Sequence, residues 1–314
     1  MNHRAYCCYT AYSLALLMWS VPARTSFVSS FITVTTTRTS ANINKCQKIV
    51  LQPFTSSSSS SSFVMSSAAE DTVTSPSEFG VDIAMNLKEV RQLIETSCKE
   101  SGRSADAVRL VAVSKTKPLS LIKEAYTNGQ RIFGENYAQE LEGKAKEFGK
   151  SDIQWHFIGN LQSNKAAKLV KNVLPYGKLV LETLGSEKVA NKLDNAMTNF
   201  DGTVLDVFVQ VNTSGEESKN GVSVDESVTL CKHIVDNCRR LKLKGIMTIG
   251  APGDDNCLDS LVTCRQLVAE SLCINPIDIE LSMGMSADFE KAIAKGSTNI
   301  RVGSTIFGQR DYSK

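Results

Sequence analysis

Lys115 and Arg301 are the two residues whose surroundings in the sequence suggest chemistry. Lys115 follows the apolar run LVAV (110–113) and Ser114, at the point where a buried strand should end. A lysine in a partly desolvated setting changes its pKa readily and can form a Schiff base with a carbonyl compound. Lysine is also an ordinary surface residue where a strand emerges into water. The residues around Lys115 must therefore decide between the two roles.

Arg301 lies inside the apolar segment NIRVGSTIF (299–307), where a buried arginine needs a partner. By strand alternation Arg301 and Gly303 face the same side, so Gly303 would leave space beside the guanidinium group. Ser304 and the backbone N–H groups around it could then hold a phosphate. An internal ion pair, for example with Glu280, is the alternative role for Arg301.

A lysine opposite a phosphate site suits pyridoxal 5′-phosphate (PLP), which links to proteins through a Schiff base. The segment SMG (282–284) could complete the phosphate site, because the loops after the last two strands of a β/α barrel often hold phosphate. Lys117 and Lys165 are rivals for the covalent role, and we expect both to be closer to solvent. A barrel that binds another phosphate metabolite without a covalent link is the remaining alternative.

From about residue 79 onward, apolar strand-like runs alternate with amphipathic helical runs. Strands joined by helices form parallel β-α units, and eight such units are typical of a single closed (β/α)8 barrel, or TIM barrel. An open nucleotide-binding sheet is less well supported, because the turn SKTKP (114–118) after the first strand has no glycine. The strands are predicted at 109–115, 131–136, 153–160, 179–184, 203–212, 242–250, 278–284 and 299–307.

The active site of such a barrel lies at the carboxyl ends of its strands. Polar residues stand at or near most of these predicted ends: Ser114, Lys115, Glu135, Asn136, His156, Asn160, Gln210, Asn212, Thr248, Ser282 and Arg301. The segment SADFEKAIAKG after the seventh strand predicts a helix that Ser286 caps and Gly296 ends. Lys115 and Arg301 are therefore expected at the same end of the barrel.

The composition and the net charge of the chain argue against some kinds of binding partner. The net charge is +2, with 42% hydrophobic and 22% charged residues, which gives no reason to expect a nucleic-acid partner. Three histidines, and nine cysteines without a C-x-x-C pair, do not predict a zinc site. The cysteines at 231 and 238, like those at 257 and 264, are seven residues apart. This spacing puts each pair on one helix face and indicates packed thiols in a reducing compartment.

The first part of the chain predicts a targeting segment. Residues 1–69 contain no Asp or Glu and include a run of serines, a composition that cannot bury a core. The apolar run YSLALLMWSV (12–21) is too short to span a bilayer but has the length of a signal-peptide core. A signal region followed by a Ser/Thr-rich tract resembles the plastid-targeting leaders of algae. We therefore expect a disordered presequence at 1–78 and a barrel at 79–314 that does not contact membranes.

The destination predicted by this leader is the plastid, favoured over the mitochondrion. A cytoplasmic protein, whose leader carries no address, is the alternative.

Six segments of the chain, in one order and spacing, carry a family resemblance. They are LVAVSKTKP, FGENYAQE, WHFIGNLQSNK, VNTSGEESKNGV, GIMTIG and LSMGMSADFEKAIAKGSTNIRVGSTIFGQR, between about Met85 and Arg310. These segments resemble the pyridoxal phosphate homeostasis protein family, single-domain PLP-binding proteins with the alanine racemase N-terminal-type barrel of fold-type III. The resemblance implies that Lys115 holds PLP covalently and that Arg301 meets the pyridine nitrogen. It also implies cofactor-binding roles for Asn136 and His156, and phosphate-binding roles for Ser282, Met283, Gly303 and Ser304.

An arginine at the pyridine nitrogen would favour a protein that holds PLP over one that uses PLP for catalysis. Arg301 cannot accept a hydrogen bond from a protonated ring nitrogen, so the ring would be a weaker electron sink than beside a carboxylate. Alanine racemase also uses a tyrosine from a second domain, whereas this sequence runs only to Lys314, a few residues after the last predicted strand. We therefore expect a monomeric, non-catalytic carrier that buffers PLP and delivers it to PLP-dependent apoenzymes. A PLP enzyme with weak amino-acid racemase activity is the alternative.

Overall fold

The described part of the chain forms a closed barrel of parallel strands. The computed structural model describes residues 80–216, 220–251 and 253–309. The eight strands pair in chain order and β8 pairs with β1, so no strand edge is left open. The strands are β1 (Arg109–Val113), β2 (Ile132–Glu135), β3 (Gln154–Phe157), β4 (Lys178–Leu184), β5 (Leu205–Gln210), β6 (Leu241–Met247), β7 (Glu280–Met285) and β8 (Asn299–Val302). The predicted TIM barrel is confirmed, and the predicted presequence lies outside the described residues.

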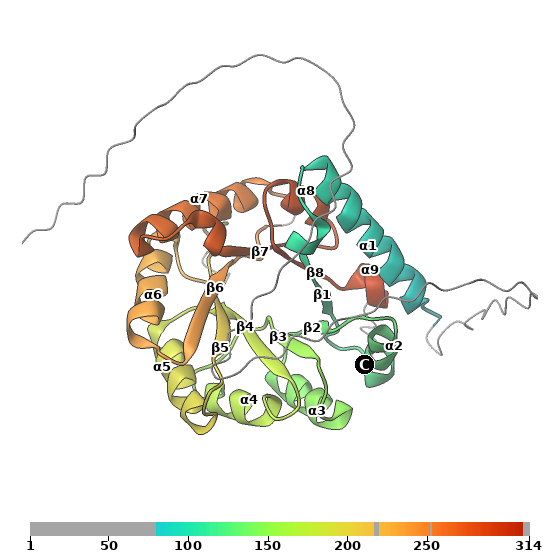
Figure 1. Ribbon diagram of the computed structural model, residues 1–314, viewed down its shortest axis with the longest axis horizontal. Helices are drawn as coiled ribbons and strands as arrows, with labels where there is room; N and C mark the ends of the chain where they lie inside the picture. Colours follow the sequence, from blue (N-terminus) through green and yellow to red (C-terminus); the bar gives the residue numbers. More distant parts are fainter. Residues whose placement is uncertain (1–79, 217–219, 252, 310–314) are drawn as a thin grey trace, which may run out of the picture. The chain divides into compact units, whose positions relative to one another are not determined.

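Helices surround this barrel (Figure 1). They are α1 (Ile83–Glu100), α2 (Leu119–Thr127), α3 (Ala138–Phe148), α4 (Ala166–Val173), α5 (Glu187–Ala196), α6 (Val224–Asn237), α7 (Asn256–Leu272), α8 (Phe289–Ala294) and α9 (Ser304–Phe307). The described residues also contain three short 3-10 turns: η1 (Ala105–Ala107), η2 (Met197–Asn199) and η3 (Pro276–Asp278). Helix α1 precedes the first strand and packs against α2, α8 and α9, so it covers the seam where β8 meets β1.

Apolar side chains form one large layer and one small cluster. Along β4, Leu179 and Leu181 belong to the large layer between the strands and the helices. The alternating residue Val180 instead joins Phe208 and Met247 in a separate buried cluster. Because successive side chains of a strand point to opposite faces, this second cluster lies inside the barrel. The outer layer therefore supplies most of the apolar burial, and the interior has room for polar groups.

The end of the predicted strand at 299–307 is helical. Strand β8 stops at Val302, and the N–H groups of Ile306 and Phe307 both donate to the carbonyl of Gly303, at 3.0 and 2.9 Å. Ile306 and Phe307 are buried, and α9 packs against α1. An apolar pair of this kind fits a strand or one helical turn equally well, which is why periodicity alone extended the strand.

Of the two predicted ends of α8 (Phe289–Ala294), the C-terminal one is confirmed and the N-terminal one is wrong. Gly296 follows the helix with φ +96°, and its N–H donates to the carbonyl of Ile293, so the predicted end is confirmed. The predicted cap is wrong: Asp288 precedes the first helical residue, and Ser286 lies in the preceding turn. The hydroxyl of Ser286 instead accepts the N–H of Gly303 at 3.2 Å. Ser286 therefore joins the segments that follow β7 and β8.

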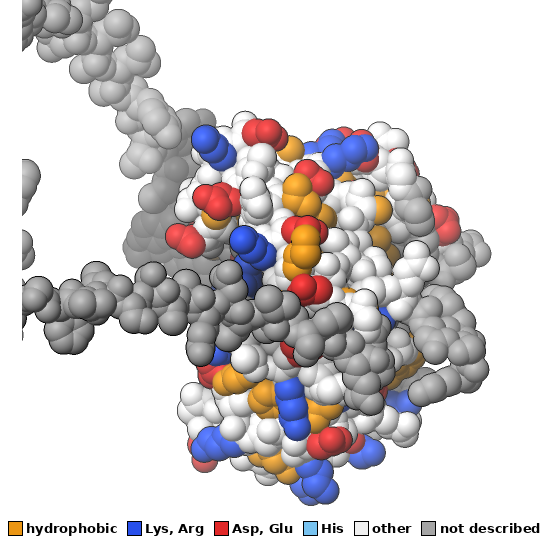
Figure 2. Space-filling view, turned by 90° about the vertical axis from the view of Figure 1, so that its right-hand side faces the viewer, with side chains coloured by type: hydrophobic (Ala, Val, Ile, Leu, Met, Phe, Trp, Pro, Cys, Tyr) orange, Lys and Arg blue, Asp and Glu red, His pale blue; other side chains and the backbone are white. Residues whose placement is uncertain are grey.

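The distribution of surface charges and the burial of the cysteines agree with what the composition predicts. Acidic and basic side chains are interspersed on the side of the barrel that lies at the right of Figure 1 (Figure 2). The paired cysteines are buried as predicted, at positions 231, 238, 257 and 264. Among the described residues, no helix combines the length and the apolar character that crossing a membrane would require.

Candidate functional site

A pocket of about 310 Å³ opens at the carboxyl ends of the strands. It brings together five of the predicted site residues, which come from the ends of β1, β2 and β8: Lys115, Asn136, Arg301, Gly303 and Ser304. The other lining residues are Val113, Lys117, Ile158, Met247, Ile249, Met285, Ser286, Ala287 and Gly308. This is the end of the barrel at which β/α barrels carry their active sites.

Lys115 stands in a tight turn directly after β1. The N–H of Ser114 still pairs with the carbonyl of Gly134 on β2, at 3.0 Å, so the strand arrangement extends up to Lys115. The chain then turns at Thr116, which has φ +62°, and the N–H of Lys117 donates back to the carbonyl of Ser114. Lys117, one of the rivals, also lines the pocket, and its Nζ donates to the carbonyl of Gln309 at 2.8 Å.

Arg301 joins the pocket to a polar layer inside the barrel. Its guanidinium donates to the hydroxyl of Ser282 at 2.5 Å and to the carbonyl of Thr248 at 2.7 Å. Its Nη1 atom is 3.9 Å from Oε2 of Glu182, and only 4% of the arginine is exposed. Buried charges are retained when they are paired and hydrogen-bonded in this way.

The alternative ion pair of Arg301 with Glu280 is not found. Glu280 is the first residue of β7, and its carboxylate pairs with Arg109 and Lys244, each at 2.7 Å. The register aligns Met285, at the other end of β7, with Arg301. Glu280 and Arg301 are therefore at different levels of the barrel.

Glu182 is the centre of the polar layer. Its carboxylate accepts hydrogen bonds from Nδ1 of His156, the hydroxyl of Ser282 and the amide of Asn299. Burial by itself would raise the pKa of Glu182, but the neighbouring His156, Arg301 and Ser282 together lower it to about 2. Glu182 is thus ionised at neutral pH, and its negative charge lies inside the barrel next to the guanidinium group of Arg301.

Two predicted site residues, His156 and Ser282, lie in this layer rather than in the pocket lining. His156 is fully buried, and its Nε2 atom is 2.8 Å from the amide of Gln154. Ser282 is also fully buried and connects Glu182 with Arg301. Ser282 is therefore connected to the pocket through Arg301, whereas His156 is one step further away, through Glu182.

The register of β7 against β8 explains which residues after β7 reach the pocket. Ser282 is level with Asn299, whereas Met285 is level with Arg301 after a register shift. Met283 points to the outer hydrophobic layer and is fully buried there. From this segment the residues that line the pocket are Met285, Ser286 and Ala287, none of which was among the predicted site residues. The segment SMGMS contains both Ser282 and Ser286, but it carries no sign of the register that decides between them.

Ser286, Gly303 and Ser304 form one corner of the pocket. All three residues line the cavity, and a Cβ at position 303 would stand 3.1 Å from the carbonyl oxygen of Val113. A side chain there would crowd the end of β1 next to Lys115. The two hydroxyls and the absence of a side chain at position 303 make a polar, open corner that an anion could enter.

Asn136 adds an unsatisfied polar atom to the lining. Its Oδ1 atom is buried and has no hydrogen-bond partner among the described residues. Buried acceptors without a partner are rare in folded proteins and call for a specific explanation. A ligand in the pocket that Asn136 lines would provide one.

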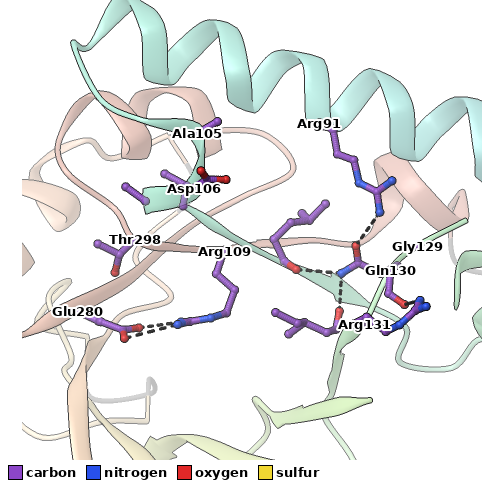
Figure 3. Close-up of a pocket in the computed structure, with 13 residues that line it drawn as sticks. Arg91, Ala105, Asp106, Arg109, Gly129, Gln130, Arg131, Glu280 and Thr298 are labelled. Atoms are coloured by element: carbon purple, nitrogen blue, oxygen red, sulfur yellow. Dashed lines mark hydrogen bonds and ion pairs between the residues drawn. The ribbon is translucent and has the colours of Figure 1, made fainter. Parts of the chain in front are cut away.

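A larger cavity of about 640 Å³ lies at the opposite end of the barrel (Figure 3). It is lined by the first residues of β1, β2 and β7. The three arginines that line it all have partners: Arg109 pairs with Glu280, Arg131 with Asp152, and Arg91 with Gln130. None of the predicted site residues lines it. Residues at this end of a β/α barrel serve stability, so we place the functional site at the smaller pocket.

The chain is similar to known proteins along its barrel. The sequence profile of the alanine racemase N-terminal domain matches residues 84–311. The pyridoxal phosphate homeostasis protein of Mus musculus is 44% identical over 250 residues, which are 76% of this chain and 89% of that protein. The protein of the same name from Haemophilus influenzae is 42% identical over 240 residues, 74% of this chain and 98% of that protein.

Solved structures agree with this match. PipY of Synechococcus elongatus PCC7942, solved with PLP bound, is 31% identical, with a TM-score of 0.59 over 72% of this chain and 100% of that chain. An alanine racemase of Clostridium difficile 630 is 14% identical, with a TM-score of 0.55 over 73% of this chain and 56% of that one, and shares the fold alone. With a matching domain over 84–311 and relatives that it covers almost from end to end, this chain belongs to the pyridoxal phosphate homeostasis protein family.

Proposed function

We propose that this protein binds PLP in intracellular vitamin B6 homeostasis, holding it as a Schiff base on Lys115 and buffering it or delivering it to apoenzymes. One observation carries the proposal: a single pocket at the carboxyl ends of the strands is lined by Lys115, Arg301 and the open corner at Gly303. The names of the relatives and the PLP-bound structure of PipY support it.

The lining residues fit PLP in chemical type. When bound, PLP supplies an aldehyde that condenses with a lysine amine and a phosphate that needs donors. Lys115 would provide the amine, while Ser286, Ser304 and the corner at Gly303 would receive the phosphate. Asn136 would direct its unsatisfied oxygen or its amide at the polar edge of the ring.

Arg301 supports a holding role over a catalytic one. Its guanidinium donates hydrogen bonds and cannot accept one, and Glu182 behind it is engaged with His156, Ser282 and Asn299. Among the described residues that line the pocket, the ionisable side chains are those of Lys115, Lys117 and Arg301. Racemisation needs an acid–base group on each face of the cofactor plane, and none of the described residues that line the pocket is a tyrosine, histidine or carboxylate that could serve as the second.

The covalent residue can be identified by fixing it chemically. We expect borohydride reduction of the protein loaded with PLP to attach the cofactor to the peptide that carries Lys115, as read by mass spectrometry. The Lys115→Ala variant should lose the label and the visible absorption of the Schiff base. The Lys146→Ala variant, altered at an exposed lysine, should keep both. A label on Lys117 or Lys165 in the wild-type protein would contradict the proposal.

The protein loaded with PLP also serves to test whether it catalyses a reaction of amino acids. We expect L-amino acids in deuterated water to exchange their Cα proton no faster than with free PLP, and an apoenzyme to regain activity when the loaded protein is added. Rapid exchange with loss of optical rotation would favour the racemase alternative.

A further inference from the structure

An ionic cluster outside the pocket holds the segment that presents Lys115. Its centre is Lys144 of α3, which is 8% exposed. The Nζ atom of Lys144 donates to the carbonyl of Ser114 at 2.8 Å, to Oε1 of Glu135 at 2.8 Å and to Oε1 of Glu140 at 2.6 Å. These three bonds use all the protons of the ammonium group.

Both chain neighbours of Lys115 are fastened to this cluster. The hydroxyl of Ser114 donates to Oε1 of Glu135 at 2.6 Å, and the N–H of Thr116 donates to Oε1 of Glu140 at 2.6 Å. Thr116 has φ +62°, a left-handed conformation that a β-branched residue adopts only when its surroundings impose it. The turn that directs Lys115 into the pocket is therefore imposed from α3.

The contribution of this cluster to the stability of the fold does not explain why charged residues are present here. Two carboxylates and one ammonium group are buried or half-buried together, and such groups can often be replaced by apolar ones at no loss of stability. The Oε2 atom of Glu135 is buried without a hydrogen-bond partner among the described residues, which adds to the cost. A role in function accounts for an arrangement of this kind.

We infer that Lys144, Glu135 and Glu140 are positioning residues for cofactor capture: they hold the segment 114–116 in the turn that aims the Lys115 amine into the pocket. None of the three lines the pocket, so they act through Ser114 and Thr116. The inference rests on the proposed function of Lys115 as the PLP-binding residue.

The ionisation of Glu135 makes this positioning sensitive to pH. Burial raises the pKa of Glu135 to about 7, against the opposing effects of Lys144 and of the Ser114 hydroxyl. The groups that face it are Lys144 and Glu140 on α3 and Ser114 after β1. Above about pH 7 the carboxylate holds Lys144 by charge, and below that pH the neutral acid does not. The wild-type protein should therefore release PLP faster as the pH falls through neutrality.

The test compares PLP release from variants of the whole chain. We expect Lys144→Met and Glu140→Gln to bind PLP about tenfold more weakly and to release it faster to an aldehyde trap, a change of the size that loss of one charge-assisted bond produces. The label should stay on Lys115. The matched control is Lys146→Met, at an exposed lysine two residues along α3, and its release rate should equal that of the wild type. If Lys144→Met does not fold, Glu140→Gln, at a partly exposed site, decides the matter.

A pH series separates positioning from a merely structural role. In Glu135→Gln the step in the release rate near pH 7 should disappear, while the titration of the cofactor itself remains in both proteins. Melting temperatures of the variants serve to show that the fold is retained. Variants that match Lys146→Met in affinity, release rate and pH profile would overturn this inference alone. Failure of the wild-type protein to label at Lys115 would instead overturn the proposed function.

Discussion

Glu182 is the residue that holds Arg301 in place below the pocket. It is fully buried, and it links strands β3, β7 and β8 through His156, Ser282 and Asn299. Breaking a buried charge pair by removing one partner leaves the other charge uncompensated. The orientation of Arg301 and the stability of the barrel therefore depend on the same carboxylate.

We expect Glu182→Gln to lower the free energy of unfolding by about 3–5 kcal/mol near neutral pH, since the charge of Arg301 is left without its partner. The pKa of Glu182 in the folded protein is about 2, below its ordinary value of 4.5. The stabilisation by the carboxylate is thus present above about pH 4.5 and is lost as the pH falls toward 2. At about 1.4 kcal/mol for each of the roughly 2.5 pH units between the two values, this contribution is about 3.5 kcal/mol.

Urea unfolding at about pH 7 and about pH 3 measures this contribution. The difference between wild type and Glu182→Gln should shrink at the lower pH, where the wild-type carboxylate loses part of its advantage. The control is Glu147→Gln, at an exposed position of α3, and it should change stability by less than about 0.5 kcal/mol. An equal difference at both pH values would contradict the role assigned to the charge.

For single residues, the sequence predicts which residue types form the site, but it does not predict how far along the barrel axis each one lies. Lys115 and Arg301 could be predicted because each is a charged residue in an apolar strand segment. Ser282 and Ser286 could not be told apart, because the register shift that aligns Met285 with Arg301 has no local signal. The cluster of Lys144 was also missed, since its partners become neighbours only when β1, β2 and α3 pack together.

The connection after β3 shows how closely elements approach at the site. Gly159 follows β3 and lies against the end of β2: a Cβ at this position would stand 1.7 Å from the carbonyl oxygen of Asn136. The hydroxyl of Thr183 on β4 donates to the carbonyl of Gly159 and holds the segment from the other side. The backbone of Asn136 is thus placed by a contact that only glycine permits.

We expect Gly159→Ala to destabilise the protein by about 1–3 kcal/mol and to weaken PLP binding, because the end of β2 must move and take Asn136 with it. The measurements are urea unfolding and the affinity for PLP. Gly185→Ala is the matched control, since a Cβ at that position meets no atom within 4 Å and should change neither quantity. A Gly159→Ala protein with unchanged PLP affinity would show that Asn136 does not depend on this contact.

All eight strands could be predicted because parallel barrel strands are buried on both faces and read as apolar runs. Their ends could not, and the segment 299–307 is the clearest case. The buried pair Ile306 and Phe307 continues the apolar run, but it packs on α1 as part of α9. The tertiary contact that decides between strand and helix involves a helix more than two hundred residues earlier in the chain.

At the scale of the molecule, the matched domain and the leader have different compositions and call for different tests. The family match covers 84–311, and it leaves the acid-free tract at 1–69 without a counterpart. The absence of Asp and Glu and the many Ser and Thr residues in this tract suit a transported leader better than an additional fold. We propose that residues 1–78 direct the barrel to a plastid, with the apolar run 12–21 as the signal that is read first.

A fluorescent protein fused behind residues 1–78 and expressed in an alga whose plastid is reached through the secretory route should accumulate in the plastid. The apolar run must enter that route as a signal-peptide core, and charges in its centre abolish such a core. The fusion with Leu16→Arg and Leu17→Arg should therefore stay outside the plastid, while Thr35→Ala and Thr36→Ala, outside the apolar run, should not alter the destination. Mitochondrial accumulation of the unaltered fusion, independent of the charges at 16 and 17, would show that the leader acts as a plain transit peptide and that its apolar run is not a signal.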